Sequence, residues 1–247
     1  MRFASTSWDG ETRLWEHKLA IYECNDACGC DGVVRRRPVV VRGDVIVESV
    51  VNEEHAGNGT LDLVRRGITA DGAIVLEPTN NKIAVSHPGG LYWQVTVPGR
   101  PRSPGARWQS GELDGVSAIE KLPVVIQALL SLEEDYNSVK SDDPMERGRS
   151  PFSLVIGRVT GGHYETVTAS EAVLRGGAYF SPVTGDIAEV MASMRDAIDN
   201  ANESDPFLKE YPARLEFLHH DDATRQSPQI PLAVALSNVL REFGENG

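Results

Sequence analysis

The sequence has few cysteines. The 247 residues contain three, Cys24, Cys28 and Cys30, all within one seven-residue stretch. An odd count in one short cluster excludes a secreted scaffold built on several disulfides. A zinc site would need a fourth ligand, which is not obvious from the sequence, because structural zinc sites usually carry a second pair of ligands. We therefore interpret the three residues as reduced thiols without a common role.

Long apolar runs and excess positive charge are also missing. The longest apolar stretch, Leu122 to Leu132, is about half of the roughly 20 residues that a membrane helix needs. The 24 basic residues are outnumbered by 36 acidic ones, which gives a net charge of −12. An acidic surface repels phosphate backbones and anionic lipids, and Arg35–Arg37 is a short basic run. Neither nucleic acid nor a membrane is an expected partner. Because residues 1–11 acquire charges before any apolar core of a signal peptide, we expect a cytoplasmic protein.

The first half of the chain predicts a strand, a helix and a second strand. The nearly continuous β-branched run from Val39 to Val51 is typical of a strand buried on both faces of a parallel sheet. Thr60 to Arg66 predicts a helix that ends at Gly67, and Ala73 to Leu76 a second buried strand. Residues 1–37 show no clear period and are left unassigned.

The pattern changes after residue 82. Residues 91–97 alternate as a half-exposed strand, and residues 116–134 predict a helix that Pro123 kinks or breaks. Residues 152–159 and 171–180 predict two strands joined through Gly161-Gly162. A helix over 186–201 and a strand over 215–218 follow. This order is that of a split-βαβ (ferredoxin-like) unit, and residues 231–243 predict a closing helix. In the helix over 116–134, the side chains expected to face inward are Ile119, Leu122, Ile126, Leu129 and Leu130.

Acidic residues follow the two predicted buried strands. Glu53 and Glu54 come after the first strand, and Glu77 comes after the second. Ligands of open α/β sheets bind beyond the carboxyl ends of the strands, so these carboxylates are expected to meet in one crevice. Carboxylate oxygens there can hold a divalent ion, and a free neighbour can take a proton from metal-bound water. A solvent-exposed acidic turn is the alternative on these residues alone.

Several motifs in a fixed order extend this pattern. They are Val50-Val51-Asn52-Glu53-Glu54 with Gly57-Asn58-Gly59-Thr60, Leu76-Glu77-Pro78-Thr79, His87-Pro88-Gly89-Gly90-Leu91-Tyr92-Trp93, Val97-Pro98-Gly99-Arg100, Gly115-Val116-Ser117-Ala118-Ile119-Glu120-Lys121, and Gly161-Gly162. Together they resemble the zinc-dependent aminoacylase and metallopeptidase family of acetylornithine deacetylase, succinyl-diaminopimelate desuccinylase and carboxypeptidase G. The resemblance covers roughly residues 39–243.

The resemblance implies zinc-dependent hydrolysis of the amide bond in an N-acylated amino acid or a related small molecule. Glu53 would be the general base, Glu54 a ligand of one zinc ion, and Glu77 a ligand of the other. The split-βαβ unit would be the family's lid, which also forms a homodimer through its edge strand and its first helix.

The sequence departs from the family at other site positions. No His-x-Asp motif precedes Glu53, and the C-terminal histidine ligand is missing. Ser103 stands where the family's lid directs a histidine at the substrate, and Thr166 and Thr168 replace an asparagine and a proline. The six histidines are His17, His55, His87, His163, His219 and His220.

We therefore expect a truncated or diverged member with an α/β fold: a partial zinc-peptidase-like core with an inserted split-βαβ lid. Residues 38–82 and 219–247 would be two parts of the catalytic core, and residues 83–218 the lid and dimerisation domain. Hydrolysis by this chain would be weak or absent. One alternative is a non-catalytic dimerising scaffold or subunit built from the lid. Another is a protein that binds a small carboxylate through Arg100, Arg102 and Arg107.

Overall fold

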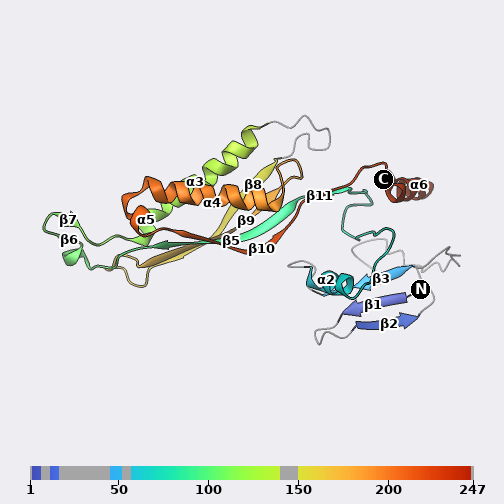
Figure 1. The fold of residues 1–247 in the computed structure, drawn as a ribbon, viewed down its shortest axis with the longest axis horizontal. Coiled ribbons are helices and arrows are strands. Elements are labelled where there is room, and N and C mark those ends of the chain that lie inside the picture. Colours follow the sequence, from blue (N-terminus) through green and yellow to red (C-terminus); the bar gives the residue numbers. More distant parts are fainter. Residues whose placement is uncertain (1, 7–11, 17–44, 52–56, 140–149, 246–247) are drawn as a thin grey trace. The chain divides into compact units, whose positions relative to one another are not determined.

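A computed structural model describes residues 2–6, 12–16, 45–51, 57–139 and 150–245. The chain divides into two compact units, Met1–Glu77 and Pro78–Gly247. Both contain helices and strands, so the fold is mixed α/β (Figure 1). No helix in the described ranges combines the length and apolar character needed to span a bilayer. The division of the sequence into core segments and a lid (1–37, 38–82, 83–218 and 219–247) stays a prediction.

In its described residues, unit 1 contains a small sheet and one helix. Its strands are β1 (Arg2–Thr6), β2 (Thr12–Glu16) and β3 (Ile46–Ser49), in the order β2-β1-β3. β1 pairs antiparallel with β2 and parallel with β3. β1 and β2 lie in the segment that shows no clear period in the sequence.

Helix α2 (Asn58–Arg65) confirms the predicted helix and its end. Gly67 has φ +81°, a conformation that glycine adopts without a steric penalty. The Ile68 N–H donates to the Leu63 carbonyl at 3.1 Å, and the Gly67 N–H to the Val64 carbonyl at 2.9 Å. These two bonds form a Schellman motif, which satisfies the carbonyls left open at the end of the helix.

Two predictions for unit 1 are wrong. The first strand is present in its described part as β3 and pairs parallel with β1, but it lies at an edge of the described sheet and is mostly exposed instead of buried on both faces. Residues 73–76 form no strand, and Val75 and Leu76 are 74% and 90% exposed. Residues 73–76 have the propensity of a strand, but no described strand pairs with them, and an unpaired strand is not stable in water.

Unit 2 holds a four-stranded sheet with helices. Its elements are β4 (Ser86–His87), β5 (Gly89–Pro98), the 3₁₀ turn η1 (Pro104–Ala106), β6 (Trp108–Gln109), β7 (Glu112–Leu113), α3 (Ala118–Ser138), β8 (Phe152–Gly161), β9 (Glu171–Phe180), α4 (Ile187–Ser204), α5 (Pro206–Glu210), β10 (Arg214–Asp221), β11 (Thr224–Arg225) and α6 (Pro231–Glu242).

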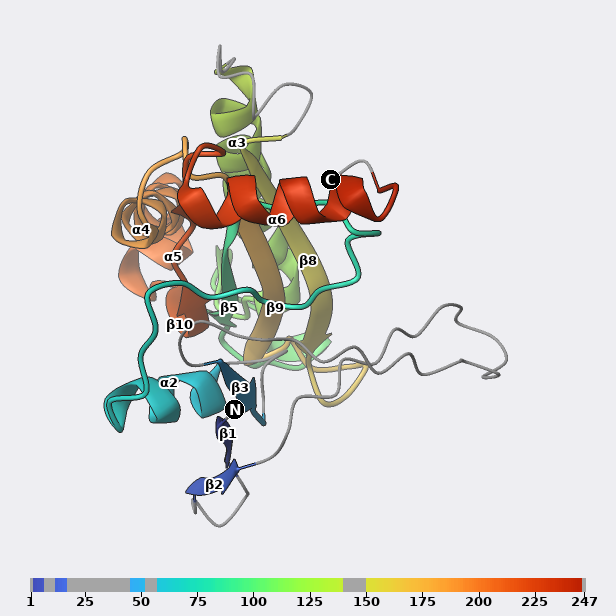
Figure 2. The ribbon, with the colours of Figure 1, turned by 90° about the vertical axis from the view of Figure 1, so that its right-hand side faces the viewer.

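The main sheet of unit 2 has the order β10-β5-β9-β8, and every neighbouring pair is antiparallel. With α3 between β5 and β8, and α4 between β9 and β10, this is the split-βαβ arrangement. Both helices cover the same face of the sheet (Figure 1). The edge strands are β8 and β10 (Figure 2).

The core lies between this sheet and the two helices. Along β5, Leu91, Trp93, Val95 and Val97 are buried, while the residues between them face the other side, as their alternation predicted. Helix α4 begins with a capping box, in which the Asp186 carboxylate accepts from the Glu189 N–H and the Glu189 side chain accepts from the Asp186 N–H.

The buried face of α3 differs from the prediction. Leu122 and Leu129 are buried as expected, but their neighbours on that face are Ala118 and Val125. The other three residues expected inside lie on a second stripe, of which Ile119 and Leu130 are exposed, whereas Ile126 is half-buried and packs against the core. The helix runs through Pro123 without a break, because this residue lies close to the N-terminus of the helix and removes only one backbone hydrogen bond.

Candidate functional site

The predicted site residues are divided between the two units. Glu53 and Glu54 lie outside the described residues. Glu77 is exposed, in an irregular stretch at the end of unit 1. Ser103 belongs to unit 2, where it is exposed and precedes the turn η1. The meeting of the three carboxylates in one crevice therefore stays a prediction.

The described residues do not by themselves fit a zinc ion. Among them, no three histidine, cysteine, aspartate or glutamate side chains are grouped so that they could hold a metal. A closed zinc site needs three or four protein ligands. Of the predicted ligands, only Glu77 lies within the described part of the chain, and a single carboxylate does not make a zinc site.

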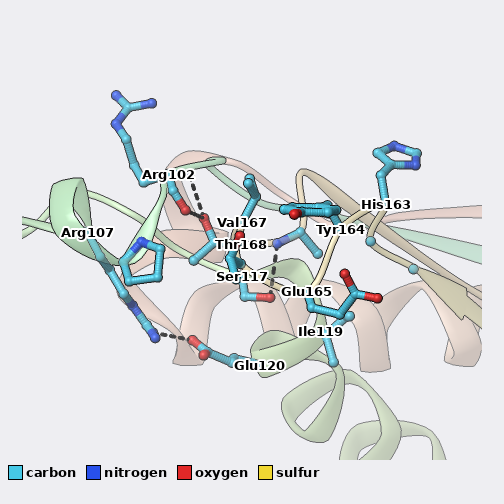
Figure 3. A pocket seen from close by; sticks show the side chains of 15 residues that line it. Arg102, Arg107, Ser117, Ile119, Glu120, His163, Tyr164, Glu165, Val167 and Thr168 are labelled. Carbon is cyan, nitrogen blue, oxygen red and sulfur yellow. Dashed lines mark hydrogen bonds and ion pairs between the residues drawn. The ribbon is translucent and has the colours of Figure 1, made fainter.

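Unit 2 contains a pocket of about 560 Å³, which we call the hairpin pocket. Three segments form it: the loop after β5, the start of α3, and the hairpin that joins β8 to β9 (Figure 3). Its lining residues include Arg102, Arg107, Ser117, Ile119, Glu120, His163, Tyr164, Glu165, Val167 and Thr168. Gly162 turns the chain into the hairpin with φ +73°.

Ion pairs fix the loop side of the hairpin pocket. The Asp114 carboxylate accepts from Arg102 Nε at 2.5 Å and from Arg100 Nη1 at 3.3 Å. The hydrogen bond from Arg102 holds the pKa of Asp114 below its ordinary value, against the opposite effect of burial. Arg107 Nη2 lies 2.5 Å from Glu120 Oε2. All three arginines that were candidate anion ligands are thus paired with carboxylates of the chain, and two of them, Arg100 and Arg102, share Asp114.

Thr168 joins the hairpin to the same loop. Its hydroxyl donates to the Arg100 carbonyl and accepts from the Arg102 N–H, both at 2.7 Å. The buried Ser117 hydroxyl accepts from the Ala169 N–H at 3.2 Å. Thr168 is therefore occupied in closing the loop, whereas the Ser117 hydroxyl, which lines the pocket, donates to no acceptor among the described residues.

Beside the pocket, β8 presents an open sheet edge. Its first half is covered by α3, because the Leu154 N–H donates to Glu133 Oε1 at 2.9 Å and Asn137 Nδ2 donates to the Phe152 carbonyl at 2.7 Å. In the described chain, no strand pairs with this edge. The exposed apolar stripe of α3, with Ile119 and Leu130, belongs to the same helix that covers the edge. We call β8 and this stripe the edge surface.

Sequence reasoning missed the hairpin pocket. Two of its segments, 102–107 and 117–120, lie close together in the chain, but the hairpin of residues 161–169 is about 40 residues further on, and no local motif connects it to them. Two signals were present, the Gly161-Gly162 pair and Gly115. A side chain at Gly115 would come within 2.7 Å of Arg102, and one at Gly161 within 2.9 Å of Ala172. Both glycines therefore mark close approaches of chain segments.

No known protein-family profile matches the chain. In sequence, the chain is 29% identical over 185 residues to N-formyl-4-amino-5-aminomethyl-2-methylpyrimidine deformylase of Bacillus subtilis, a match that covers 72% of this chain and 42% of that protein. It is 27% identical over 184 residues to a peptidase M20 domain-containing protein of Schizosaccharomyces pombe, covering 74% and 41%. The chain thus spans less than half the length of these relatives.

Two solved structures have the same fold over about half of their length. Aminopeptidase PepT from Bacillus cereus matches with a TM-score of 0.55 and 18% identity, covering 81% of this chain and 48% of that one. The di-peptidase Dug1p from Saccharomyces cerevisiae matches with a TM-score of 0.55 and 12% identity, covering 81% and 52%. At these identities the structures establish the fold alone. The chain is thus similar in sequence to proteins of the M20 peptidase type, at modest identity and over less than half of their length.

Proposed function

We propose that the split-βαβ sheet of unit 2 is the lid and dimerisation domain of an M20-type amidohydrolase. The edge surface is the observation that carries this proposal. An open strand edge offers unpaired N–H and C=O groups, and the same edge of a second copy complements it through a two-fold axis. The exposed stripe of α3 would supply apolar area beside the paired strands. Such a pair of copies would extend the sheet from four strands to eight.

Oligomeric state tests the dimer. Light scattering during gel filtration should give a dimer for the wild-type chain. Replacing Leu130 and Val159 by lysine would place charges on the helix stripe and on β8, and this double variant should elute as a monomer. Leu218→Lys changes an exposed residue on β10, the opposite edge, and should stay dimeric. A wild-type monomer at high micromolar concentration would overturn the proposal.

For the reaction, we propose hydrolysis of the amide bond in N-acylated amino acids or related small molecules. The support is the sequence relation to a deformylase and to an M20 peptidase, whose names both describe cleavage of a C–N bond. A formyl amide of an aromatic amine therefore belongs in the substrate panel. Glu53 is the proposed general base, with Glu54 and Glu77 as zinc ligands and Ser103 facing the substrate. A location in the cytoplasm stays part of this proposal.

Activity and metal binding test the reaction separately from the dimer. N-acetyl, N-succinyl and N-formyl substrates should be hydrolysed weakly or not at all by this chain, and any rate should be lost in Glu53→Ala. Zinc titration by calorimetry should show weak binding. Micromolar or tighter binding of two zinc ions per chain would contradict the expectation of an impaired site.

A non-catalytic dimerising subunit is the second candidate. The edge surface favours it as well, because pairing through β8 and α3 needs no catalytic residue. Dimers that hydrolyse no substrate, with or without zinc, would support this role, whereas hydrolysis that depends on Glu53 would exclude it.

A further inference from the structure

We propose that the uncovered face of the main sheet of unit 2 binds single-stranded nucleic acid. Helices α3 and α4 cover one face of this sheet, and we call the other side the open face (Figure 1). The strand register shows which side chains share it, because residues paired across neighbouring strands point to the same face. This site depends neither on the proposed amide hydrolysis nor on the proposed dimer.

Two tyrosine rings lie flat on the open face. Tyr92 on β5 is paired with Gly177 on β9, and Tyr179 on β9 is paired with Gly90 on β5. A methyl group at Gly177 would lie 3.7 Å from the Tyr92 ring, and one at Gly90 would lie 3.3 Å from the Tyr179 ring. Each ring therefore extends over the glycine of the neighbouring strand. The outer sides of the rings face solvent, because Tyr92 is 48% and Tyr179 is 61% exposed.

Two arginines on the open face have no carboxylate partner. Arg158 on β8 and Arg175 on β9 are paired directly across the strands, and both are exposed. Arg175 Nε donates to the uncharged Gln94 Oε1 at 2.7 Å. Neither arginine forms an ion pair with any described residue. Like charges directly opposite each other destabilise a sheet, so an anion that binds both guanidinium groups would relieve their repulsion.

The acidic groups of the open face lie away from this arginine pair. Glu216 is on β10, and β5 separates it from β9, which places it about 10 Å from Arg175 along the sheet. Asp221 is bonded to His219 at 2.7 Å, and Glu171 is at the far end of β9. The net charge of −12 repels nucleic acid at long range, which is why the sequence predicts no such partner. Because salt screens that repulsion beyond about 10 Å, the local arrangement predicts weak and salt-sensitive binding.

The spacing of the rings and the arginines suits a strand with unpaired bases. Tyr179 and Arg175 are the two diagonal neighbours of Tyr92 on β9, each about 7 Å away. Bases that are splayed out of a single strand stack on such rings, and arginines bind the phosphates between them. In RNA-recognition modules a four-stranded sheet presents aromatic side chains in the same way and stacks two or three bases, which is an analogy of architecture alone.

Three probes separate the contribution of the bases from that of the phosphates. A fluorescein-labelled oligo(dT) of about eight nucleotides, an abasic strand of the same length and the corresponding double strand would be titrated by fluorescence anisotropy. In about 50 mM NaCl, the single strand should bind with a Kd on the order of 10⁻⁵ M, and about 200 mM NaCl should weaken it about sevenfold, as expected for two phosphate contacts. The abasic strand and the double strand should bind at least about tenfold more weakly, because neither offers free bases to the rings.

Substitutions on the open face test the named residues. Tyr92→Ala and Tyr179→Ala should each weaken binding of oligo(dT) about tenfold, whereas Tyr179→Phe, which keeps the ring, should bind like the wild type. Arg158→Gln should weaken the complete and the abasic strand by the same factor and lower the slope of the salt dependence by about 0.7. Trp108→Ala and Arg241→Gln are matched controls, because they remove exposed side chains from β6 and α6, and they should leave binding unchanged.

Amide shifts of the ¹⁵N-labelled wild-type protein locate the strand without any variant. They should concentrate on β5, β8 and β9. Equal binding of the complete, abasic and double strands, or no binding of any probe, would overturn the proposal. So would amide shifts confined to residues outside this sheet. Binding of dTMP as tight as that of oligo(dT) would also overturn it, because the open face would then be a mononucleotide site.

Discussion

Gly176 and Gly177 are adjacent on β9 and provide a sharp test of the sheet. A methyl group on Gly176 would lie 2.0 Å from the Val155 carbonyl oxygen and 2.4 Å from the ring of Trp93. Trp93 is fully buried, so its ring would have to shift by about 1 Å within a close-packed core. Strand β8 would also have to move. Overpacking of this kind should lower the free energy of unfolding of unit 2 by about 3 kcal/mol.

Gly177→Ala is the matched control. A methyl group there would point to the opposite face of the sheet, and its nearest neighbour would be the Leu91 carbonyl oxygen at 3.5 Å, an ordinary contact. Because glycine weakens a strand interior, this variant should be neutral or more stable by about 0.5–1 kcal/mol. Urea unfolding followed by circular dichroism measures both variants. Equal stability of Gly176→Ala and the wild type would refute the assigned packing of Trp93 beneath β9.

Two further substitutions test polar contacts in unit 2. Asn202 is buried, and its side chain accepts a hydrogen bond from the Ala213 N–H at 2.8 Å and donates one to the Ala213 carbonyl at 3.1 Å. Asn202→Ala should therefore lower the free energy of unfolding by about 3 kcal/mol in the same urea experiment. A decrease below about 1 kcal/mol would contradict this role. Burial alone would raise the pKa of Asp205, but hydrogen bonds from Lys121, Leu208 and Phe207 hold it below its ordinary value. The stability from this carboxylate is thus present above about pH 4 and is lost as the pH falls through the lowered pKa. Asp205→Asn should reduce the decrease in the free energy of unfolding at acidic pH. An unchanged pH dependence would contradict the interaction.

Much of unit 2, and helix α2 of unit 1, could be predicted because their signals are local. The alternation along β5 sets which residues face the core, since successive side chains of a strand point to opposite faces. Asp186 and Glu189 mark the start of α4, and Gly67 marks the end of α2, because each satisfies backbone groups within a few residues. The split-βαβ order followed from such elements in sequence.

Other features depended on what surrounds a segment. Residues 73–76 have the composition of a buried strand, but a strand also needs hydrogen-bonded neighbours, and no described strand pairs with it. Helix α3 carries two apolar stripes that the sequence does not distinguish, and packing on the sheet buried Ala118 and Val125 while leaving Ile119 and Leu130 exposed.

The sequence by itself determined the helices and strands of the lid-like sheet, their order, and the relation to the M20 peptidases through short motifs. Only the tertiary structure decided that Arg100 and Arg102 share the Asp114 carboxylate, and that Thr168, on the β8–β9 hairpin, closes the same loop through hydrogen bonds to the backbone of both arginines. The physical reason is that charge compensation depends on distances in space, and the residues that set those distances lie on segments remote from one another in the chain.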